Sequence, residues 1–506
     1  MNVVPMTPIT SVKICRNVPL DSTYKDTLDF ASVSAQTSYF SGKAKQTFTN
    51  LTPVRLQNAL RLPVNADSVY DCNYIMFQNA NFNQKWFYAF ITKINFVNVN
   101  MCEISFELDV MQTWMFDYTL KPSFVEREHI INDVIGANLV PENLETGDYV
   151  QMGAAYNSIT SMPLIIVVAT TFDNNGNWAP GQLYNKVYSG LKYYAWEVNE
   201  IDALNNFLES VNNAGKADGI VSIFMMPKPF YGTALSPLRL ETEKNYTSLK
   251  DGYIPRNKKL FIYPYNFINV TNGQGDSADY RYEYFSSNNC IFDYYGDTTP
   301  NPTVLFYPIG YKGSGAQNYE EGITMSGYPQ CSFNTDVFKA WLAQNASSLA
   351  VSTLSSVTQV AGGALTGNAV MATSGIARIT DLVGQVYQHD VLPPQARGSS
   401  YNGSLNVALD RKEFIVRKMS IQPEFARIID DYFNMYGYAT NEVKIPNVTG
   451  RQSWNYVKTI DCKAIGSIPF EDMDKIRSIY DSGITFWHGD WVGDYDRPNG
   501  EVINNV

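Results

Sequence analysis

Apolar and polar residues alternate strictly along residues 103–110, the stretch EISFELDV. One set of alternate positions holds Ile104, Phe106, Leu108 and Val110, and the other holds Glu103, Ser105, Glu107 and Asp109. Because successive side chains of a β-strand point to opposite faces, the pattern predicts a strand with one buried and one acidic face. An aromatic and β-branched run precedes it at residues 86–96, and the Asn-rich junction at 98–100 predicts a turn. We therefore expect an antiparallel hairpin.

Apolar residues recur at helical spacing in two longer stretches. In residues 200–214 they are Ile201, Leu204, Phe207, Leu208 and Val211, with short apolar runs on either side at 163–170 and 220–226. In residues 421–438 they are Phe425, Ile428, Ile429, Tyr432 and Phe433, and Gly437 marks the end. The first stretch predicts a small α/β unit inserted in the chain, and the second predicts an amphipathic helix. A shorter helix is expected near residues 471–480.

The remaining patterns are typical of strands. Residues 259–270 and 280–285 are rich in aromatic residues and lie on either side of Asn272 and Gly273, a hairpin signal. Residues 401–417 again alternate. The chain is thus predicted to be mainly β with an α/β insertion, of the α+β class.

The chain has no charged residue between Lys339 and Arg378, although 17% of all its residues are charged. A helix rises about 1.5 Å per residue and a bilayer core is about 30 Å thick, so this uncharged stretch, residues 340–377, is long enough to cross a membrane. Gly362 and Gly363 interrupt it, which predicts two helices around a break, the first at 336–361. The candidate loop residues are Leu342, Leu349, Val351, Leu354, Val357, Val360, Gly362, Gly363, Leu365, Gly367, Val370 and Ile376.

Two structures are compatible with the uncharged stretch. Its many Ala, Ser and Gly residues suit a buried pair of core helices as well as a membrane-active loop. Gly363 and Gly367 have the spacing that lets helices approach closely in lipid, and Pro393 and Pro394 end the second helix and begin a return. An inserted hairpin with a polar stem fits the flanking residues best.

Composition excludes several classes of function. A net charge of -11 and a sequence pI near 4.9 argue against a protein that grips nucleic acid. The N-terminus lacks a basic start followed by an apolar run, so secretory export is not expected. The six cysteines are scattered without paired spacing, which favours free thiols in a reducing cytoplasm and no zinc site.

An enzymatic interpretation finds little support. Glu126, Glu128 and His129 lie close together, as do His488 and Asp490 beside Trp487, but neither group has a recognisable ligand or catalytic spacing. Asp430 and Asp431 are adjacent on a predicted helix and so face differently, which fits capping or solvation better than glycoside cleavage. We expect no catalytic residue, no metal and no cofactor.

The acidic strand face has two interpretations. It is most simply the solvated side of a sheet. If several copies closed a ring, however, Glu103, Glu107 and Asp109 would line a lumen whose negative charge repels phosphates and lets DNA slide.

Five stretches add a resemblance to these patterns: FELDVMQTW from Phe106, VEREH from Val125, GYIPRNKKLFIYPY from Gly252, DDYFNMYGY from Asp430 and RQSWNYVKT from Arg451. In combination and order they resemble the tail-knob, or distal tail-tube, proteins of the small short-tailed phages that replicate with protein-primed DNA. The resemblance covers nearly the whole chain, and none of its motifs is a catalytic signature.

The resemblance implies a homohexameric ring at the distal end of the tail, built from tail-tube-like β-barrel or sandwich domains. A long apolar helical loop of each subunit would plug the tube and, on infection, enter the host membrane to open a channel for the genome. The chain would then contain an N-terminal β tube domain at 1–130, an inserted α/β domain at 131–235, a β-rich domain at 236–339, the plug loop at 340–397 and a part completing the tube and knob at 398–506.

The resemblance also implies partners and a location. The expected partners are further copies of the chain, other tail proteins such as the lower collar and tail-tip components, host membrane lipids, and passing double-stranded DNA without specific binding. The protein would be made in the bacterial cytoplasm and carried in the virion. The alternative is a tail-tip adhesin that binds a host receptor or carbohydrate and forms no pore, although an adhesin has no use for the uncharged stretch.

Overall fold

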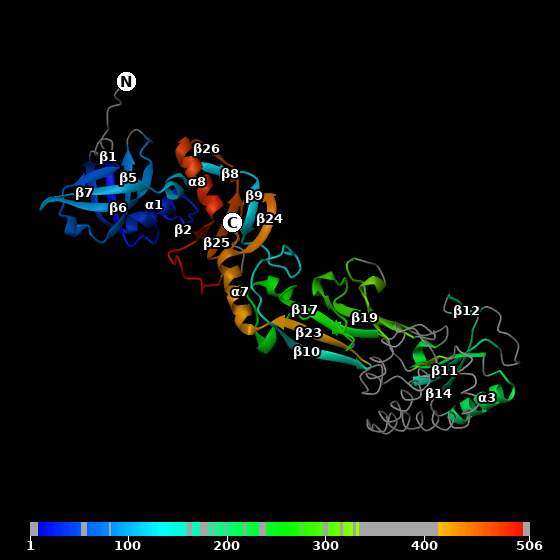
Figure 1. Ribbon diagram of the computed structural model, residues 1–506. Coiled ribbons are helices and arrows are strands. Elements are labelled where there is room, and N and C mark those ends of the chain that lie inside the picture. Colours follow the sequence, from blue (N-terminus) through cyan, green and yellow to red (C-terminus); the bar gives the residue numbers. More distant parts are fainter. Residues whose placement is uncertain are drawn as a thin grey trace. The chain divides into compact units, whose positions relative to one another are not determined.

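The computed structural model of the chain (Figure 1) divides into two compact units. Unit 1 contains residues 1–145, 255–260 and 424–506, and unit 2 contains residues 146–254 and 261–423. The structure describes residues 9–51, 58–79, 82–158, 164–172, 182–184, 187–189, 191–197, 200–216, 219–231, 239–273, 275–296, 302–313, 317–326, 330–332 and 413–498. Unit 1 therefore combines both ends of the chain with a short insert from its middle.

The first sheet of unit 1 has six antiparallel strands in the order β3-β1-β5-β6-β7-β4. The strands are β1 Ile9–Arg16, β3 Ala44–Leu51, β4 Ala59–Leu62, β5 Cys72–Asn79, β6 Trp86–Asn98 and β7 Met101–Leu108. Helix α1, Val33–Gly42, begins after Ser32, whose hydroxyl accepts a hydrogen bond from the Ala35 backbone N–H. One core cluster comes mainly from this sheet and includes the fully buried Val12, Leu60 and Ile104.

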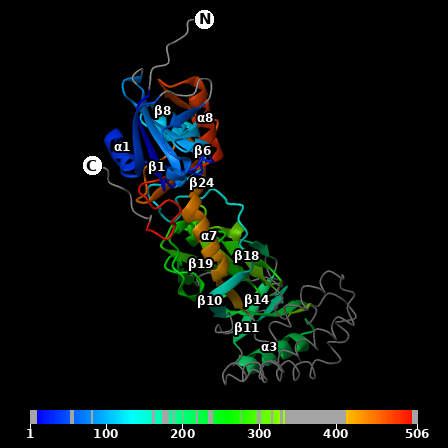
Figure 2. The same cartoon turned by 90° about the vertical axis from the view of Figure 1, so that its left-hand side faces the viewer.

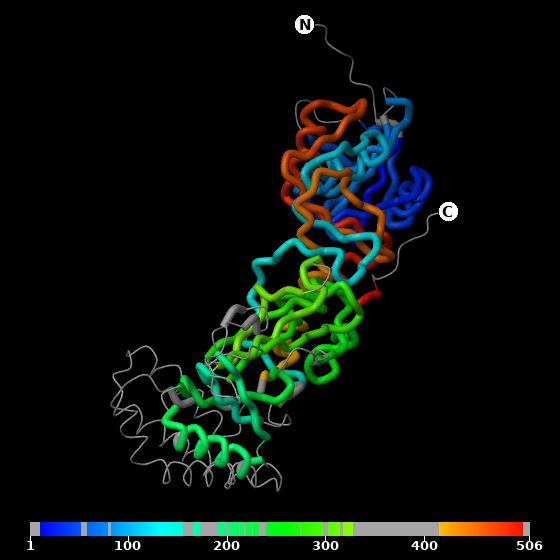
Figure 3. Tube along the Cα trace, turned by 90° about the vertical axis from the view of Figure 1, so that its right-hand side faces the viewer, coloured from blue at the N-terminus to red at the C-terminus, as the bar shows by residue number. Residues whose placement is uncertain are grey.

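The second sheet of unit 1 combines strands from both ends of the chain, in the order β2-β27-β25-β9-β24. The strands are β2 Asp26–Leu28, β9 Ser123–Glu128, β24 Tyr438–Lys444, β25 Trp454–Ile460 and β27 Ile484–Trp487. Figure 3 shows the blue and cyan N-terminal trace beside the orange and red C-terminal trace in this unit. One core cluster accordingly joins N-terminal residues such as Trp114 to C-terminal residues such as Trp487.

Smaller elements complete unit 1. They are the two-stranded ladder of β8 Tyr118–Leu120 with β26 Ala464–Gly466, and the helices α2 Val110–Trp114, α7 Pro423–Tyr436 and α8 Phe470–Ser482. Figure 2 shows α1 and α8 on either side of the strands of this unit. Helix α7 ends at Tyr436 and is followed by Gly437, which has a φ of +65° and donates its N–H to the Phe433 carbonyl. A Cβ at Gly437 would lie 2.2 Å from the Glu128 carbonyl oxygen, so only glycine fits there.

Unit 2 contains three four-stranded sheets among its described residues. The first is β10 Tyr149–Ser158, β23 Glu413–Ile421, β17 Asn266–Thr271 and β18 Ser277–Tyr280. The second is β14 Lys192–Glu197, β11 Leu164–Thr170, β15 Ile220–Pro227 and β22 Gln330–Ser332, with helix α3 Ile201–Asn213. The third is β16 Arg239–Glu243, β19 Asn289–Gly296, β20 Val304–Ile309 and β21 Ile323–Met325. A separate ladder joins β12 Gln182–Tyr184 to β13 Val187–Ser189.

Short 3₁₀ helices connect many of these elements. They are η1 Ala66–Ser68, η6 Lys228–Phe230, η7 Lys250–Gly252, η8 Lys258–Phe261, η9 Tyr282–Tyr284 and η10 Tyr319–Glu321.

Several predictions from local pattern are confirmed. Strands β6 and β7 form the expected antiparallel hairpin. The predicted strand, helix and strand of the inserted α/β unit correspond to β11, α3 and β15. Helices α7 and α8 lie where apolar spacing placed them, and the chain is mainly β. On α7, Ile429 and Phe433 are buried as predicted, whereas Ile428 is exposed.

Three local predictions need correction. Strand β7 ends at Leu108, because Asp109 caps helix α2 and leaves the strand. Residues 259–270 are not one strand: η8 occupies the start and β17 begins only at Asn266. The return strand β18 ends at Tyr280, and the predicted 280–285 strand is instead mostly η9.

Candidate functional site

The candidate plug loop lies outside the described residues. This holds for all twelve positions assigned to it, from Leu342 to Ile376, and for the whole range 340–397. Within the parts of the chain that the structure describes, none of the helices has the length and apolar character needed to span a bilayer.

Glu103 and Glu107 lie on the same side of strand β7, as the alternation predicts, and each has a cation beside it. Arg61 is directly opposite Glu103 in the β4–β7 ladder, and its Nε donates to Glu103 Oε2 over 3.0 Å. Lys475 Nζ on α8 donates to Glu107 Oε1 over 2.6 Å. The acidic face is therefore partly neutralised within the chain, which weakens the field it projects.

Asp109 has a different role from these two glutamates. It is buried, and its carboxylate accepts hydrogen bonds from the Gln112 backbone N–H at 3.1 Å and from the Tyr74 hydroxyl at 2.7 Å. Burial raises the pKa of Asp109 to about 6. Asp109 is thus the N-cap of α2 and shares no surface with Glu103 and Glu107, which leaves those two as the candidates for a lumen.

His129 is a packing residue with both ring nitrogens occupied. Its Nδ1 accepts the Tyr456 backbone N–H at 2.8 Å, and its Nε2–H therefore donates to the Asn434 carbonyl at 3.0 Å. Burial, reinforced by the positive charge of Arg451, lowers the pKa of His129 to about 3. The imidazole is neutral, and its hydrogen bonds leave no nitrogen for a substrate or metal.

The glutamates next to His129 are also engaged in structural contacts. Buried Glu128 forms an ion pair with Lys444 Nζ at 2.8 Å and accepts a hydrogen bond from the Asn447 backbone N–H at 2.9 Å. Glu126 pairs with Lys458 Nζ at 2.8 Å. The three residues of the VEREH stretch that resembled an acid/base group are thus separated into different contacts.

The second histidine group is likewise part of the scaffold. His488 Nε2 lies 3.1 Å from Asn455 Oδ1, and His488 Nδ1 lies 3.2 Å from Asp29 Oδ2. Asp490 pairs with Lys43 Nζ at 2.8 Å. The described residues contain no group of three or more His, Cys, Asp or Glu side chains arranged to hold a metal ion.

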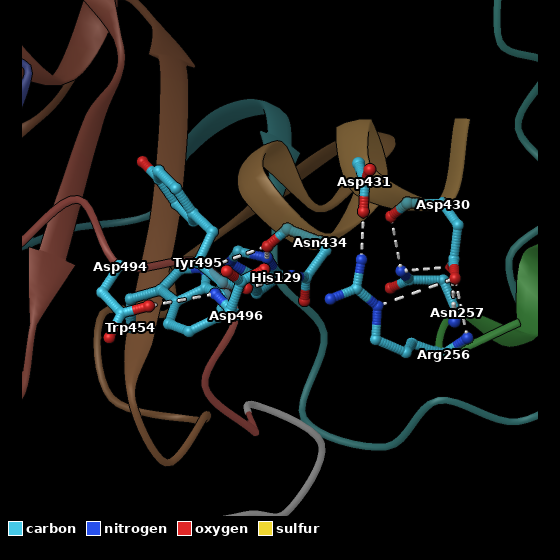
Figure 4. Close-up of polar contacts among 10 residues, drawn as sticks. All are labelled: His129, Arg256, Asn257, Asp430, Asp431, Asn434, Trp454, Asp494, Tyr495 and Asp496. Carbon is cyan, nitrogen blue, oxygen red and sulfur yellow. Dashed lines mark hydrogen bonds and ion pairs between the residues drawn. The ribbon is translucent and has the colours of Figure 1, made fainter. Parts of the chain in front are cut away.

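The most elaborate polar site is where Asp430 of α7 holds the insert 255–260, which we call the clasp peptide. Fully buried Asp430 accepts the backbone N–H groups of Arg256 at 2.9 Å and Asn257 at 3.0 Å, and the Asn257 side-chain amide at 2.8 Å. The neighbouring Asp431 is exposed and pairs with the Arg256 guanidinium. Figure 4 shows the two carboxylates reaching the clasp peptide from one helix turn.

The next two clasp residues are held by other carboxylates of unit 1. The Lys258 backbone N–H donates to Asp133 Oδ2 at 2.8 Å, and Lys259 Nζ donates to Glu142 Oε1 at 2.7 Å. The Tyr438 hydroxyl also donates to Asp133, at 2.8 Å. Burial lowers the pKa of Lys259, and the adjacent Glu142 opposes that shift. Four consecutive residues are therefore anchored, which fixes the path of the clasp peptide.

A second polar cluster lies on α7 around Asn434 (Figure 4). The Asn434 carbonyl accepts from His129 and from the Trp454 indole N–H at 2.8 Å, and its side-chain amide donates to the Tyr495 carbonyl at 3.0 Å. Four of the five stretches that carried the family resemblance thus meet: those beginning at Val125, Gly252, Asp430 and Arg451. Sequence reasoning singled out these stretches but missed that they contact one another, and no local periodicity could have shown it.

Comparison with known proteins identifies relatives over the whole length. A family model described as the C-terminal domain of Bacillus phage phi29 tail knob protein gp9 matches residues 232–500, and a model described as the N-terminus of caudoviral major tail proteins matches residues 8–119. Tail knob protein gp9 of Bacillus phage B103 is 28% identical, with 97% of this chain and 98% of that protein covered. Tail knob protein gp9 of Bacillus phage phi29 is 27% identical at the same coverage.

A solved structure shows the same fold. The bacteriophage C1 tail knob protein gp12 superposes with a TM-score of 0.57 and 15% identity, and the match covers 95% of this chain and 97% of that one. Helix α7 and the clasp peptide both lie inside the range of the gp9 family model.

Proposed function

The chain belongs to the phage tail knob protein family of phi29 gp9, and from this premise we propose that it forms a homohexameric tube at the distal end of a phage tail. Residues 340–377 of each copy would plug this tube and then enter the host membrane as the genome leaves. As a tail knob protein the chain is a structural component of the virion that assembles with other tail proteins. Its relatives are structural proteins rather than enzymes.

The uncharged stretch is the observation that carries this proposal. It holds no charge between Lys339 and Arg378 in a chain with a net charge of -11. A central Arg or Asp costs roughly 2.5–3.5 kcal/mol on insertion into a bilayer, and a ring would multiply that cost by its number of copies. Absence of charge is what a segment needs if it is to leave a tube and enter lipid.

Dye release from liposomes tests membrane activity. We expect purified full-length protein to release dye at neutral or mildly acidic pH, and a variant lacking residues 340–377 to release none. Val357→Asp should reduce release at least about tenfold because a carboxylate must be desolvated in each copy, whereas the matched control Val357→Ala should keep most of it.

Two outcomes would redirect the proposal. Intact rings without leakage under any condition would leave a structural tube whose loop only seals the lumen. A deletion variant that still binds host cells and still supports infection would favour the receptor- or carbohydrate-binding adhesin instead.

A further inference from the structure

Three exposed apolar side chains lie in a row across the outer face of the second sheet of unit 1. Phe124 on β9 is directly opposite Val443 on β24 and directly opposite Ile460 on β25. Directly opposed residues of antiparallel strands share a face and have Cβ atoms about 5 Å apart. Val443 is 71% exposed and Ile460 is 52% exposed. Since solvated sheet faces normally carry polar side chains, this apolar stripe of Phe124, Val443 and Ile460 requires an explanation.

The apolar stripe reaches the edge of its sheet. Strand β24 is the last strand in the order β2-β27-β25-β9-β24. Edge strands are normally protected by charges or covering segments, because an apolar edge invites another chain to pair or pack there. The position of Val443 on this strand therefore makes the stripe accessible to another molecule.

The β6–β7 hairpin carries a second exposed apolar set. Strand β5 pairs only with residues 86–90 of β6, while β7 accompanies β6 as far as Asn98. The outer half of the hairpin thus extends beyond β5. At its end Phe96 is 63% exposed, Val99 is 69% exposed, and Val97 is exposed as well. We call Phe96, Val97 and Val99 the apolar tip.

The turn that carries the apolar tip and the edge strand of the apolar stripe lie on opposite sides of unit 1 (Figure 1). In Figure 1 the turn between β6 and β7 is at the left edge of this unit and β24 is at its right edge. Two separate patches cannot form a single self-complementary surface of the kind that makes a two-fold dimer. They suit a head-to-tail contact, which uses two different surfaces of each copy and closes into a ring.

Size and charge are consistent with such a contact. Each patch supplies one aromatic ring and two aliphatic side chains, the composition of an apolar interface centre that a polar rim surrounds. The exposed cation of the hairpin is Lys93, and the exposed carboxylate beside Val443 is Glu442. Glu442 lies 3.8 Å from Lys444 Nζ, so the rim of the stripe carries both signs, and its exposed carboxylate can pair with Lys93 of the tip.

We propose that the apolar tip of one copy docks on the apolar stripe of the next copy in the ring. The inference rests on the proposed function, because a ring is what supplies each copy with a neighbour on both sides. It assigns the partner of both patches: a second copy of this chain.

Matched surface variants test the contact. The tip variant is Phe96→Ser with Val99→Ser, and the stripe variant is Val443→Ser with Ile460→Ser. The control is Ile428→Ser on α7, a residue that is 65% exposed and in neither patch. Sedimentation velocity over a concentration series should show association weakened on the order of 30-fold or more for each double variant, and unchanged for the control.

Mixing the two double variants separates a head-to-tail contact from other geometries. The tip variant keeps an intact stripe, and the stripe variant keeps an intact tip, so one good junction forms between them. We expect discrete dimers in the equimolar mixture and no rings, while each variant alone stays monomeric. A symmetric contact would show no such rescue.

Cysteine cross-linking gives an answer even if a double variant folds poorly. The pair Val99→Cys and Val443→Cys in one chain should give a ladder of covalent oligomers on oxidation, and the pair Val99→Cys and Ile428→Cys should give none. Cys15, Cys72, Cys102, Cys290 and Cys462 are buried, so these five contribute little background.

The possible failures are distinguishable. If the wild-type protein forms rings and leaks liposomes while both double variants associate normally and no ladder appears, tip and stripe are not the contact and the proposed function stands. If the wild-type protein never self-associates and never leaks, both proposals are overturned.

Discussion

A titratable residue in this protein can be a packing element with no chemistry to perform, and His129 is the clearest example. Both ring nitrogens are committed to backbone groups, Nδ1 as an acceptor for Tyr456 and Nε2–H as a donor to Asn434. A second proton on Nδ1 would remove the first of these hydrogen bonds and place a charge near Arg451. The fold therefore holds the imidazole neutral.

His129 should lower stability in mild acid, whereas Asp109, whose pKa burial raises to about 6, acts in the opposite direction over part of the same range. The pKa is about 3 in the folded chain against a usual value of 6.5, so between these values the unfolded chain binds the extra proton and the folded chain does not. The contribution of His129 to the unfolding free energy should thus decline as pH falls below 6.5, by up to about 1.4 kcal/mol per pH unit. Urea unfolding at about pH 7 and about pH 5 measures the slope.

Replacement of the imidazole provides the comparison for that slope. His129→Asn lowers stability at every pH but removes the titrating imidazole, so between about pH 7 and about pH 5 its unfolding free energy should fall less than that of the wild type. An equally steep decline in the variant would show that other groups cause it.

At the scale of elements, two neighbouring aspartates give helix α7 two different contacts with the clasp peptide. Asp430 is buried and satisfies two backbone N–H groups and a side-chain amide of the clasp peptide, whereas Asp431 is exposed and pairs with the Arg256 side chain. One helical step of about 100° thus separates a buried anchor from a surface ion pair.

The two aspartates form a matched pair of mutations. Asp430→Ala leaves the buried N–H of Asn257 and the partly buried N–H of Arg256 without their acceptor and should cost roughly 3–5 kcal/mol of stability. Asp431→Ala removes a solvent-exposed ion pair and should cost no more than about 1 kcal/mol. Denaturant unfolding of both variants measures the difference, and equal losses would contradict the assigned roles.

Local pattern predicts those elements whose partners lie nearby in the sequence. The β6–β7 hairpin and helices α3, α7 and α8 follow from periodicity and a turn or glycine signal. The strand predicted for residues 259–270 is absent at Lys258–Phe261 for a different reason. There the backbone N–H of Lys258 donates to Asp133, and that of Lys259 donates to the Tyr438 hydroxyl. Those partners are more than a hundred residues away, so no local alternation reveals them. Asp109 left the predicted acidic face because it caps α2 through the Gln112 backbone N–H and also accepts a hydrogen bond from Tyr74.

At the scale of the whole molecule, the proposed tube for DNA would have to control its charge. The chain carries a net charge of -11, yet the paired Glu103 and Glu107 show that part of this charge is balanced locally by Arg61 and Lys475. A surface of moderate negative potential repels the phosphates of DNA and holds few counterions.

Charge reversal tests whether Glu103 and Glu107 face passing DNA. Glu103→Lys with Glu107→Lys should slow genome release from assembled particles, because phosphates would bind added lysines in every copy. The control Glu424→Lys with Glu471→Lys makes the same change of charge at exposed helix positions. Ejection followed with a DNA-binding dye at two salt concentrations gives the rates. Equal rates for both variants would place β7 away from the DNA path.

The interleaving of the two chain ends in unit 1 sets an order for events on the ribosome. Strand β9 is made early, but its neighbours β24 and β25 are made only after unit 2. Translation from residue 145 to residue 424 covers 279 residues and takes roughly 15–60 s at about 5–20 residues per second. During that interval the core cluster that joins Trp114 to Trp487 lacks its C-terminal residues, so the N-terminal half of unit 1 is incomplete. The part of the protein that is synthesised first is therefore completed last.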